Sequence, residues 1–251
     1  MADLRRVFEY AAVLALGASL AFGSLMSGAR AASIPTISTI IVGGSAAKGW
    51  NDPIGHGYVE RGLTAYGEAE GVRFAIKNYA IRGAPVVDRR VARAYPTWLE
   101  RLGPNGIVVL AWGMLNDLRL GTPPGDVEAA LNRQIALALA HRDLVLVVTP
   151  PVTRLSVGKW RLSEADLVRL EVSVAERFRS PRVHVVNTYF PELHVWRTRH
   201  YNYRRFMYNG YDPNRHGYAL AGHILARELE SSWNVGPTVP ADPGALVMNV
   251  R

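Results

Sequence analysis

The side chains of Ser45, Asp212 and His216 are of the three types that acyl transfer through a serine requires. In that chemistry a serine hydroxyl attacks a carbonyl carbon, a histidine takes its proton, and a carboxylate orients the imidazole ring. Ser45 follows an apolar run at 37–42 and two glycines. Because glycine lets the backbone turn sharply, this pattern predicts a serine presented at the end of a strand. An ordinary exit from a strand into a loop is the other interpretation.

Two later segments offer N–H donors for the negative charge that develops on the attacked carbonyl. Gly83 ends the segment 78–83 and supplies a backbone amide, while Asn116 in the segment 112–117 supplies a side-chain amide. Each well-placed donor lowers the barrier by about 3 kcal/mol. We therefore expect the oxyanion donors to be the amides of Ser45 and Gly83 and the side chain of Asn116. Each residue alone would also be explained by a turn or a cap.

Elements that could position these residues alternate along the chain. Apolar runs predict five strands, and segments with helical spacing predict five longer helices. The strands are expected at 37–42, 72–78, 106–112, 144–149 and 183–187, and the helices at 55–70, 86–102, 124–141, 163–179 and 213–232. This alternation predicts an α/β fold with a five-stranded parallel sheet covered by helices on both faces. The candidate residues follow strand ends, which meet at one edge of such a sheet.

The start of the last predicted helix determines how Asp212 and His216 relate to each other. If the helix begins at Pro213, Asp212 is its N-cap, and His216 lies four residues further on the same face. Asp212 could then orient His216 toward Ser45. His200 and His194, which precede this helix, are further candidates for the base, although no surrounding pattern supports them.

From about residue 37 to 229 the chain resembles the SGNH hydrolases, also called the GDSL esterases and lipases. The segment 43–45 is similar to the family's first block, 78–83 to its N-x-G-x-x-G block, and 112–117 to a third block that reads W-G-G-x-N-D in some members. The resemblance implies a flavodoxin-like three-layer α/β/α sandwich and an ester hydrolysis that needs no cofactor or metal. It also implies that Ser45 is the nucleophile, with the oxyanion donors named above.

The chain departs from the family pattern in its first and last blocks. Gly44 replaces an aspartate before the serine. Family members commonly read D-G-x-H-P-N-x-x-G-Y in the last block, where this chain reads NGYDPNRHGY. Aligned residue by residue, Asn209 takes the place of the acid and Asp212 that of the histidine. Two hypotheses follow: a working site of Ser45, His216 and Asp212, or a degenerate or differently equipped site.

The segment before the last helix is rich in aromatic residues and arginines. Aromatic faces stack on sugar rings, and arginine binds carboxylate or phosphate. The candidate substrate contacts are Trp196, Arg199, Tyr203, Tyr208 and Tyr211. The alternative is that half of these rings pack beneath a long loop while the arginines remain solvated.

The first 31 residues have the pattern of a secretory signal peptide. Two arginines precede an apolar stretch at 11–26, and Ala29-Arg30-Ala31 matches a cleavage site. Cleavage near Ala31 would leave a hydrolase-like domain at 32–233 and a coil tail at 234–251, in the periplasm of a bacterium or outside the cell. An uncleaved signal that anchors the chain to the membrane is the alternative. The absence of cysteine excludes a lipoprotein anchor and disulfides.

Charge and composition leave the class of partner open. The formal net charge is +8, but the basic residues are spread along the chain and match no nucleic-acid-binding motif. We expect an exported serine esterase that removes an acyl group, for example acetyl, from a cell-envelope or extracellular carbohydrate. One alternative is a catalytically degenerate protein that binds polysaccharide or supports its assembly and export. Another is a lipid ester or thioester hydrolase.

Overall fold

A computed structural model describes residues 34–157 and 161–233 of the chain. The predicted signal peptide at 1–31 and the predicted tail at 234–251 lie outside these residues, as does the cleavage site near Ala31. Within the described part, no helix combines the length and the apolar character needed to cross a membrane.

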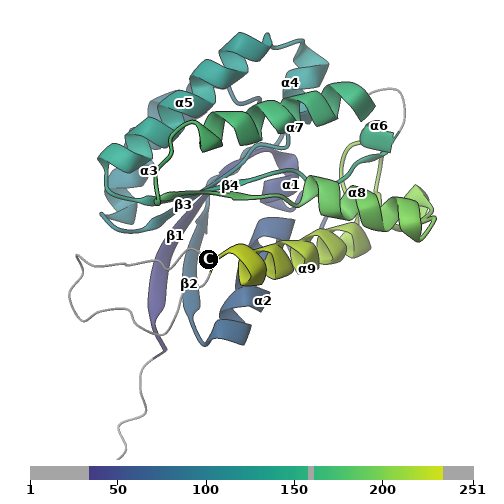
Figure 1. Ribbon diagram of the computed structural model, residues 1–251, viewed down its shortest axis with the longest axis horizontal. Coiled ribbons are helices and arrows are strands. Elements are labelled where there is room, and N and C mark those ends of the chain that lie inside the picture. Colours follow the sequence, from purple (N-terminus) through teal and green to yellow (C-terminus); the bar gives the residue numbers. More distant parts are fainter. Residues whose placement is uncertain (1–33, 158–160, 234–251) are drawn as a thin grey trace, which may run out of the picture. The chain divides into compact units, whose positions relative to one another are not determined.

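Five parallel strands form one sheet in the order β2-β1-β3-β4-β5, as the sequence predicts (Figure 1). Their bounds are β1 Thr36–Gly43, β2 Arg73–Asn78, β3 Ile107–Ala111, β4 Leu144–Val148 and β5 Val183–Val186. Strands β3 and β4 are buried along their whole length. Helices cover both faces of a parallel sheet, so these central strands are continuous apolar runs without polar alternation.

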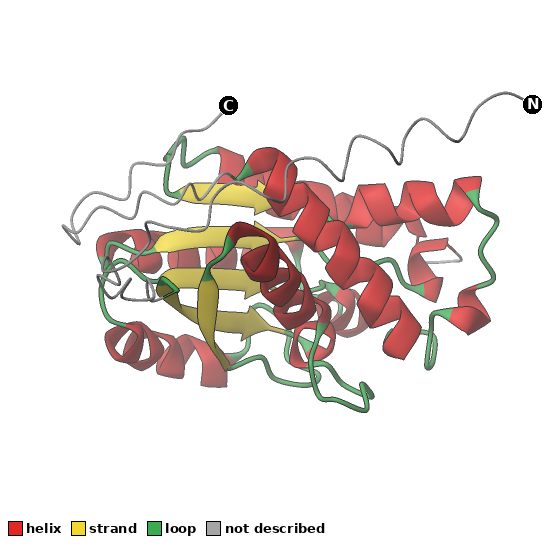
Figure 2. Ribbon diagram, turned by 90° about the horizontal axis from the view of Figure 1, so that it is seen from below, coloured by secondary structure: helices red, strands yellow, loops and turns green. Residues whose placement is uncertain are grey.

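Helices form the two outer layers of the sandwich (Figures 1 and 2). The longer ones are α2 Tyr58–Glu70, α3 Arg89–Leu102, α5 Pro124–Ala140, α7 Arg161–Glu176 and α9 Arg215–Ser232. Helices α2 and α9 cover one face, and α3, α5 and α7 cover the other. The three-layer α/β/α fold class is thereby confirmed.

Shorter helices lie in the connections, mostly beyond the strand ends. They are α1 Ser45–Lys48, α4 Leu115–Leu120, α6 Arg154–Val157 and α8 Tyr189–Thr198, with a single 3₁₀ turn, η1, at Tyr203–Arg205. None of them was predicted, because short helices contain too few turns for a clear hydrophobic period.

The two helices on the first face pack closely because glycines meet where they cross. A Cβ atom on Gly62 of α2 would lie 2.5 Å from Cδ2 of Leu225, and one on Gly222 of α9 would lie 2.8 Å from Cβ of Arg61. Neither distance is compatible with a side chain at these positions. Helix α9 is thus held against α2, and its start lies near the carboxyl edge of the sheet.

The prediction that Asp212 caps the last helix was wrong. Helix α9 begins at Arg215, and its N-cap is Asn214, whose Oδ1 accepts hydrogen bonds from the backbone N–H groups of His216, at 2.9 Å, and Gly217, at 3.2 Å. Pro213 instead lies opposite Met207 in an isolated antiparallel bridge. Asparagine caps a helix about as well as aspartate, so Asn214 takes the role two residues later.

Candidate active site

Ser45 begins helix α1 directly after the end of strand β1. Gly43 lies so close to β3 that a Cβ atom there would be 1.9 Å from the carbonyl oxygen of Ala111. Gly44, with an extended backbone, donates its N–H to the same oxygen at 3.3 Å. These contacts fix the turn that presents Ser45 at the carboxyl edge. As the first helical residue, Ser45 has a backbone N–H without an acceptor inside α1.

Gly83 lies in the loop that follows β2, next to the end of β1. The loop is tied to that strand by a hydrogen bond of 2.9 Å from the N–H of Ile81 to the carbonyl of Gly43. Gly83 has a φ of +73°, which only glycine adopts at little cost. The structure thus gives a physical reason for glycine at this position of the segment 78–83.

Helix α4 carries Asn116 and is attached to the same loop by two side chains. Asn116 donates its Nδ2 to the carbonyl of Ala84 at 3.2 Å. The buried carboxylate of Asp117 accepts the N–H of Val86 at 3.1 Å. Burial raises the pKa of Asp117 to about 6, while hydrogen bonds from Val86 and Thr122 act in the opposite direction. Asn116 and Asp117 therefore hold α4 and the Gly83 loop in a fixed relation.

Asp212 lies in a tight turn that Asn209 organises. Oδ1 of Asn209 accepts the N–H groups of Tyr211 and Asp212, both at 2.7 Å, and its Nδ2 donates to Oδ2 of Asp212 at 3.1 Å. Asp212 is only 8% exposed. Its other oxygen, Oδ1, is buried and has no hydrogen-bond partner among the described residues. Asp212 thus keeps one carboxylate oxygen without a hydrogen-bond partner in the described part of the chain.

One pocket of about 260 Å³ brings these elements together at the carboxyl edge of the sheet. Its lining includes Ser45, Gly83, Asn116 and Asp212, four of the five residues that the sequence assigned to the reaction centre. The remaining lining residues are Arg82, Leu115, Arg119, Asn209 and Tyr211. One small cavity is thus lined by a hydroxyl group, by possible N–H donors and by a carboxylate.

The sequence around this pocket matches a known protein family. Residues 41–220 match the family model of the GDSL-like lipase/acylhydrolase family, which spans most of the chain. The chain belongs to this family. It is a serine ester hydrolase of the GDSL type, as the resemblance of its sequence blocks implied. No curated protein sequence matches it.

Several solved structures share the fold. Axe2, an acetylxylan esterase from Geobacillus stearothermophilus, superposes with a TM-score of 0.62 at 16% identity, over 78% of this chain and 95% of Axe2. A lipolytic G-D-S-L protein from Veillonella parvula superposes with a TM-score of 0.57 at 18% identity, over 77% of this chain and 96% of that protein. LAE5, an alpha/beta hydrolase enzyme from the metagenome of Lake Arreo, superposes with a TM-score of 0.61 at 20% identity, over 77% of this chain and 95% of LAE5. These identities establish the fold and not the substrate.

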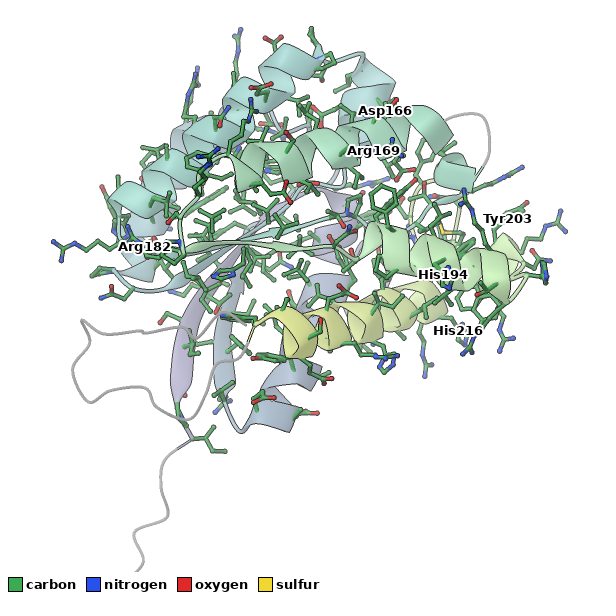
Figure 3. All side chains as sticks on the ribbon, in the orientation of Figure 1. Asp166, Arg169, Arg182, His194, Tyr203 and His216 are labelled. Atoms are coloured by element: carbon green, nitrogen blue, oxygen red, sulfur yellow. The ribbon has the colours of Figure 1, made fainter. Side chains whose placement is uncertain are left out.

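His216 is the one residue of the predicted reaction centre that does not line the pocket. Its side chain is exposed in the first turn of α9 (Figure 3), and the side chain of Asp212 bonds to Asn209. Ser45 and Asp212 thus line the pocket together, and His216 is not among its lining residues. His194 and His200 are also exposed and do not line this pocket. In this member of the GDSL family, Asp212 occupies the cavity where a histidine is expected.

The predicted substrate contacts separate into buried and exposed side chains. Trp196 is 5% exposed, lies 5.7 Å from the ring of Phe206 between centroids and donates its Nε1 to Glu192, so it belongs to the core and cannot stack on a sugar. The guanidinium of Arg154 covers the ring of Tyr203. The other three predicted contacts, Arg199, Tyr208 and Tyr211, are exposed, and of these Tyr211 lines the pocket.

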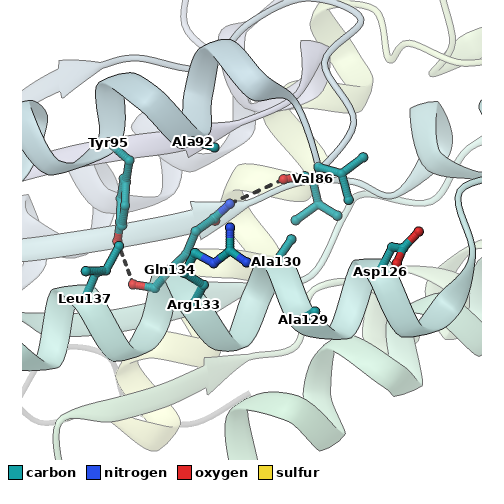
Figure 4. A pocket seen from close by; sticks show the side chains of 10 residues that line it. Val86, Ala92, Tyr95, Asp126, Ala129, Ala130, Arg133, Gln134 and Leu137 are labelled. Carbon is teal, nitrogen blue, oxygen red and sulfur yellow. Dashed lines mark hydrogen bonds between the residues drawn. The ribbon is translucent and has the colours of Figure 1, made fainter.

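A second cavity, of about 280 Å³, lies between α3 and α5 (Figure 4). Gln134 in its wall donates to the carbonyl of Val86 and accepts the Nε1–H of Trp112 at 2.9 Å. None of the candidate reaction residues lines this cavity. Elsewhere in the described part of the chain, no three His, Cys, Asp or Glu side chains gather closely enough to hold a metal ion.

Proposed function

We propose that the chain hydrolyses an acyl ester through an acyl-enzyme on Ser45, with Asp212 as the proton acceptor. The observation that carries this proposal is that Asp212, whose Oδ1 is buried and unpartnered, lines the same cavity as Ser45, Gly83 and Asn116. Asn209 donates to the other carboxylate oxygen, Oδ2, at 3.1 Å, which leaves Oδ1 without a partner among the described residues.

The reaction follows from the roles of these groups. As Oγ of Ser45 bonds to the acyl carbon, its proton passes to Asp212, and the carbonyl oxygen becomes negative. The amides of Ser45 and Gly83 and Nδ2 of Asn116 stabilise that oxyanion. Collapse breaks the bond to the alcohol oxygen, which takes the proton from Asp212. Water then repeats the sequence, releasing the acid and free Ser45.

A carboxylate is a weaker base than imidazole, so this arrangement implies slower turnover than a histidine would give at neutral pH. His216 is exposed and does not line the pocket, so it does not supply the missing imidazole. A protein of the same fold that only binds a polysaccharide is the competing function, and it predicts no turnover.

The proposed substrate is a short acyl ester on a cell-envelope or extracellular carbohydrate. Support comes from the signal-like sequence of residues 1–31, which would export the chain, and from the name of Axe2 as an acetylxylan esterase. The pocket is small and lined mostly by polar side chains, which favours an acetyl-sized group over a fatty acyl chain.

Hydrolysis of p-nitrophenyl acetate by four purified proteins tests the proposal. Ser45→Ala and Asp212→Asn should each lower kcat/KM about 100-fold or more, because they remove the nucleophile and the proton acceptor. His216→Ala should stay within about twofold of the wild type, since its side chain lies outside the pocket. An equal loss in His216→Ala and Asp212→Asn would overturn the role of Asp212. No turnover by the wild type would support the binding function.

A further inference from the structure

Two arginines line the pocket beside Ser45, although nothing in the reaction above uses them. Arg82 comes from the loop after β2, next to Gly83, and Arg119 comes from α4. In the part of the chain that the structure describes, neither side chain forms an ion pair or a hydrogen bond with another residue. The one carboxylate in the lining, that of Asp212, is bonded to Asn209 instead. The pocket therefore presents two cations without an acidic partner.

Arg82 is held in place by an aromatic ring. Its guanidinium carbon lies 3.5 Å from the ring centroid of Trp50, which is a cation–π contact. The backbone of Trp50 is itself held by two hydrogen bonds. Its backbone N–H donates to the carbonyl of Ser45 at 3.1 Å, and its carbonyl accepts the hydroxyl of Tyr218 at 2.8 Å. A guanidinium stacked by its face keeps its N–H edge free for a planar anion. Trp50 thus contacts both the backbone of Ser45 and the guanidinium of Arg82.

We propose that the substrate carries a carboxylate, as an acylated uronic acid does, and that Arg82 and Arg119 bind this group. The inference rests on the proposed function, because it specifies the alcohol part of the ester that Ser45 attacks. Two free arginines beside the nucleophile give the ester a second attachment point, which orients it for attack. The formal charge of +8 adds long-range attraction toward a polyanion.

A matched pair of esters tests this assignment. In 4-acetoxybenzoate the phenol carries a carboxylate, and in methyl 4-acetoxybenzoate the same position is neutral. The wild type should prefer the anionic ester by about tenfold in kcat/KM, although its leaving group is chemically the poorer one. Raising NaCl from about 20 mM to about 500 mM should reduce this preference, because salt screens exposed charges.

Variants of the two arginines locate the effect. Arg82→Gln and Arg119→Gln should each lower the ratio of anionic to neutral kcat/KM by about fivefold or more. Arg93→Gln removes the same charge from an exposed position of α3 outside the pocket and should retain the ratio. Equal losses for both esters in the pocket variants would overturn the proposal, since the arginines would then serve the reaction centre.

The remaining outcomes distinguish failure of the proposed function from failure of the carboxylate assignment, and a carboxylate from a phosphate on the substrate. Turnover of both esters at equal rates would overturn the carboxylate assignment alone, whereas turnover of neither would overturn the proposed function. In that second case, calorimetric titration of Ser45→Ala with 4-hydroxybenzoate still tests the site, because binding that weakens in Arg119→Gln supports it and no binding overturns it. A stronger preference for 4-acetoxyphenyl phosphate than for 4-acetoxybenzoate would overturn the uronate in favour of a phosphorylated substrate.

Discussion

At the scale of single residues, the pair formed by Asn209 and Asp212 distinguishes this site from the usual GDSL pattern. Asn209 accepts two backbone N–H groups with Oδ1 and donates Nδ2 to Asp212, so it both builds the turn and holds the carboxylate. An aspartate at 209 could accept the same N–H groups and also an imidazole N–H. The backbone of the turn is therefore compatible with asparagine and aspartate at 209 and 212, as here, and with aspartate and histidine.

Restoring the usual pair should raise activity. The double variant Asn209→Asp with Asp212→His should increase kcat/KM for p-nitrophenyl acetate by about tenfold or more above pH 7, because imidazole is the stronger base. Asp212→His alone should gain less, since Asn209 keeps a donor directed at the ring. Steady-state kinetics check this, with circular dichroism to verify folding. A folded double variant slower than the wild type would contradict the account.

The sequence predicted some of these residues and not others for physical reasons. Ser45, Gly83 and Asn116 follow strand ends, and parallel topology alone makes such positions converge. The geometry of Asp212 and His216 was not predictable, because Asp212 and Asn214 are both good caps and the choice between them shifts the helix start. Arg82 and Arg119 were not predicted, since nothing in the sequence indicates that they share a pocket.

At the scale of elements, the attachment of α4 to the Gly83 loop is what places donors from two separate segments around one point. Asn116 holds Ala84, and Asp117 holds Val86. Positions of the five strands were predictable from apolar runs. The short α4 that makes these contacts was not, because six residues give no measurable period.

Removing the hydrogen bond between Asp117 and Val86 should lower kcat by more than the loss of folding stability explains. Asp117→Ala leaves the buried N–H of Val86 without its acceptor, so it should cost about 1–3 kcal/mol of stability and lower kcat about tenfold while changing KM little. Asp143→Ala is the matched control, because Asp143 is also buried and accepts the N–H of Gly106 at 3.1 Å, at the amino end of β3.

Asp143→Ala should lose comparable stability in urea denaturation and keep its kcat. If both variants lose kcat to the same degree, Asp117 acts only on the fold. Unchanged kcat in Asp117→Ala would equally contradict a positioning role.

At the scale of the whole molecule, several carboxylates are buried among apolar helices away from the pocket. Burial raises the pKa of Glu192 to about 8, although the N–H groups of Val152 and Trp196 act against this shift. Burial also raises the pKa of Glu171 well above its ordinary value. The sequence predicted the three-layer fold that encloses these groups but gave no sign of which acids it would bury.

These buried acids make stability dependent on pH. Folded Glu192 keeps a proton up to about pH 8 that the unfolded chain releases near its ordinary pKa of 4.5, so the free energy of unfolding should fall as pH rises. Between about pH 6.5 and 8.5 the contribution of Glu192 is about 2 kcal/mol. Urea denaturation across this range measures it.

Glu192→Gln should flatten this dependence by the same amount, since glutamine has no proton to lose. Glu176→Gln, at an exposed position of α7, is the matched control and should leave the slope unchanged. A slope in Glu192→Gln as steep as that of the wild type would show that Glu192 is not the group that titrates.

The most direct test of the central claim is covalent labelling of the nucleophile by a fluorophosphonate, read by mass spectrometry of the intact protein and its peptides. The account predicts one adduct, on Ser45, forming at similar rates in the wild type and His216→Ala and about 100-fold more slowly in Asp212→Asn. An adduct on another residue, or labelling of Ser45 that depends on His216 and not on Asp212, would contradict it.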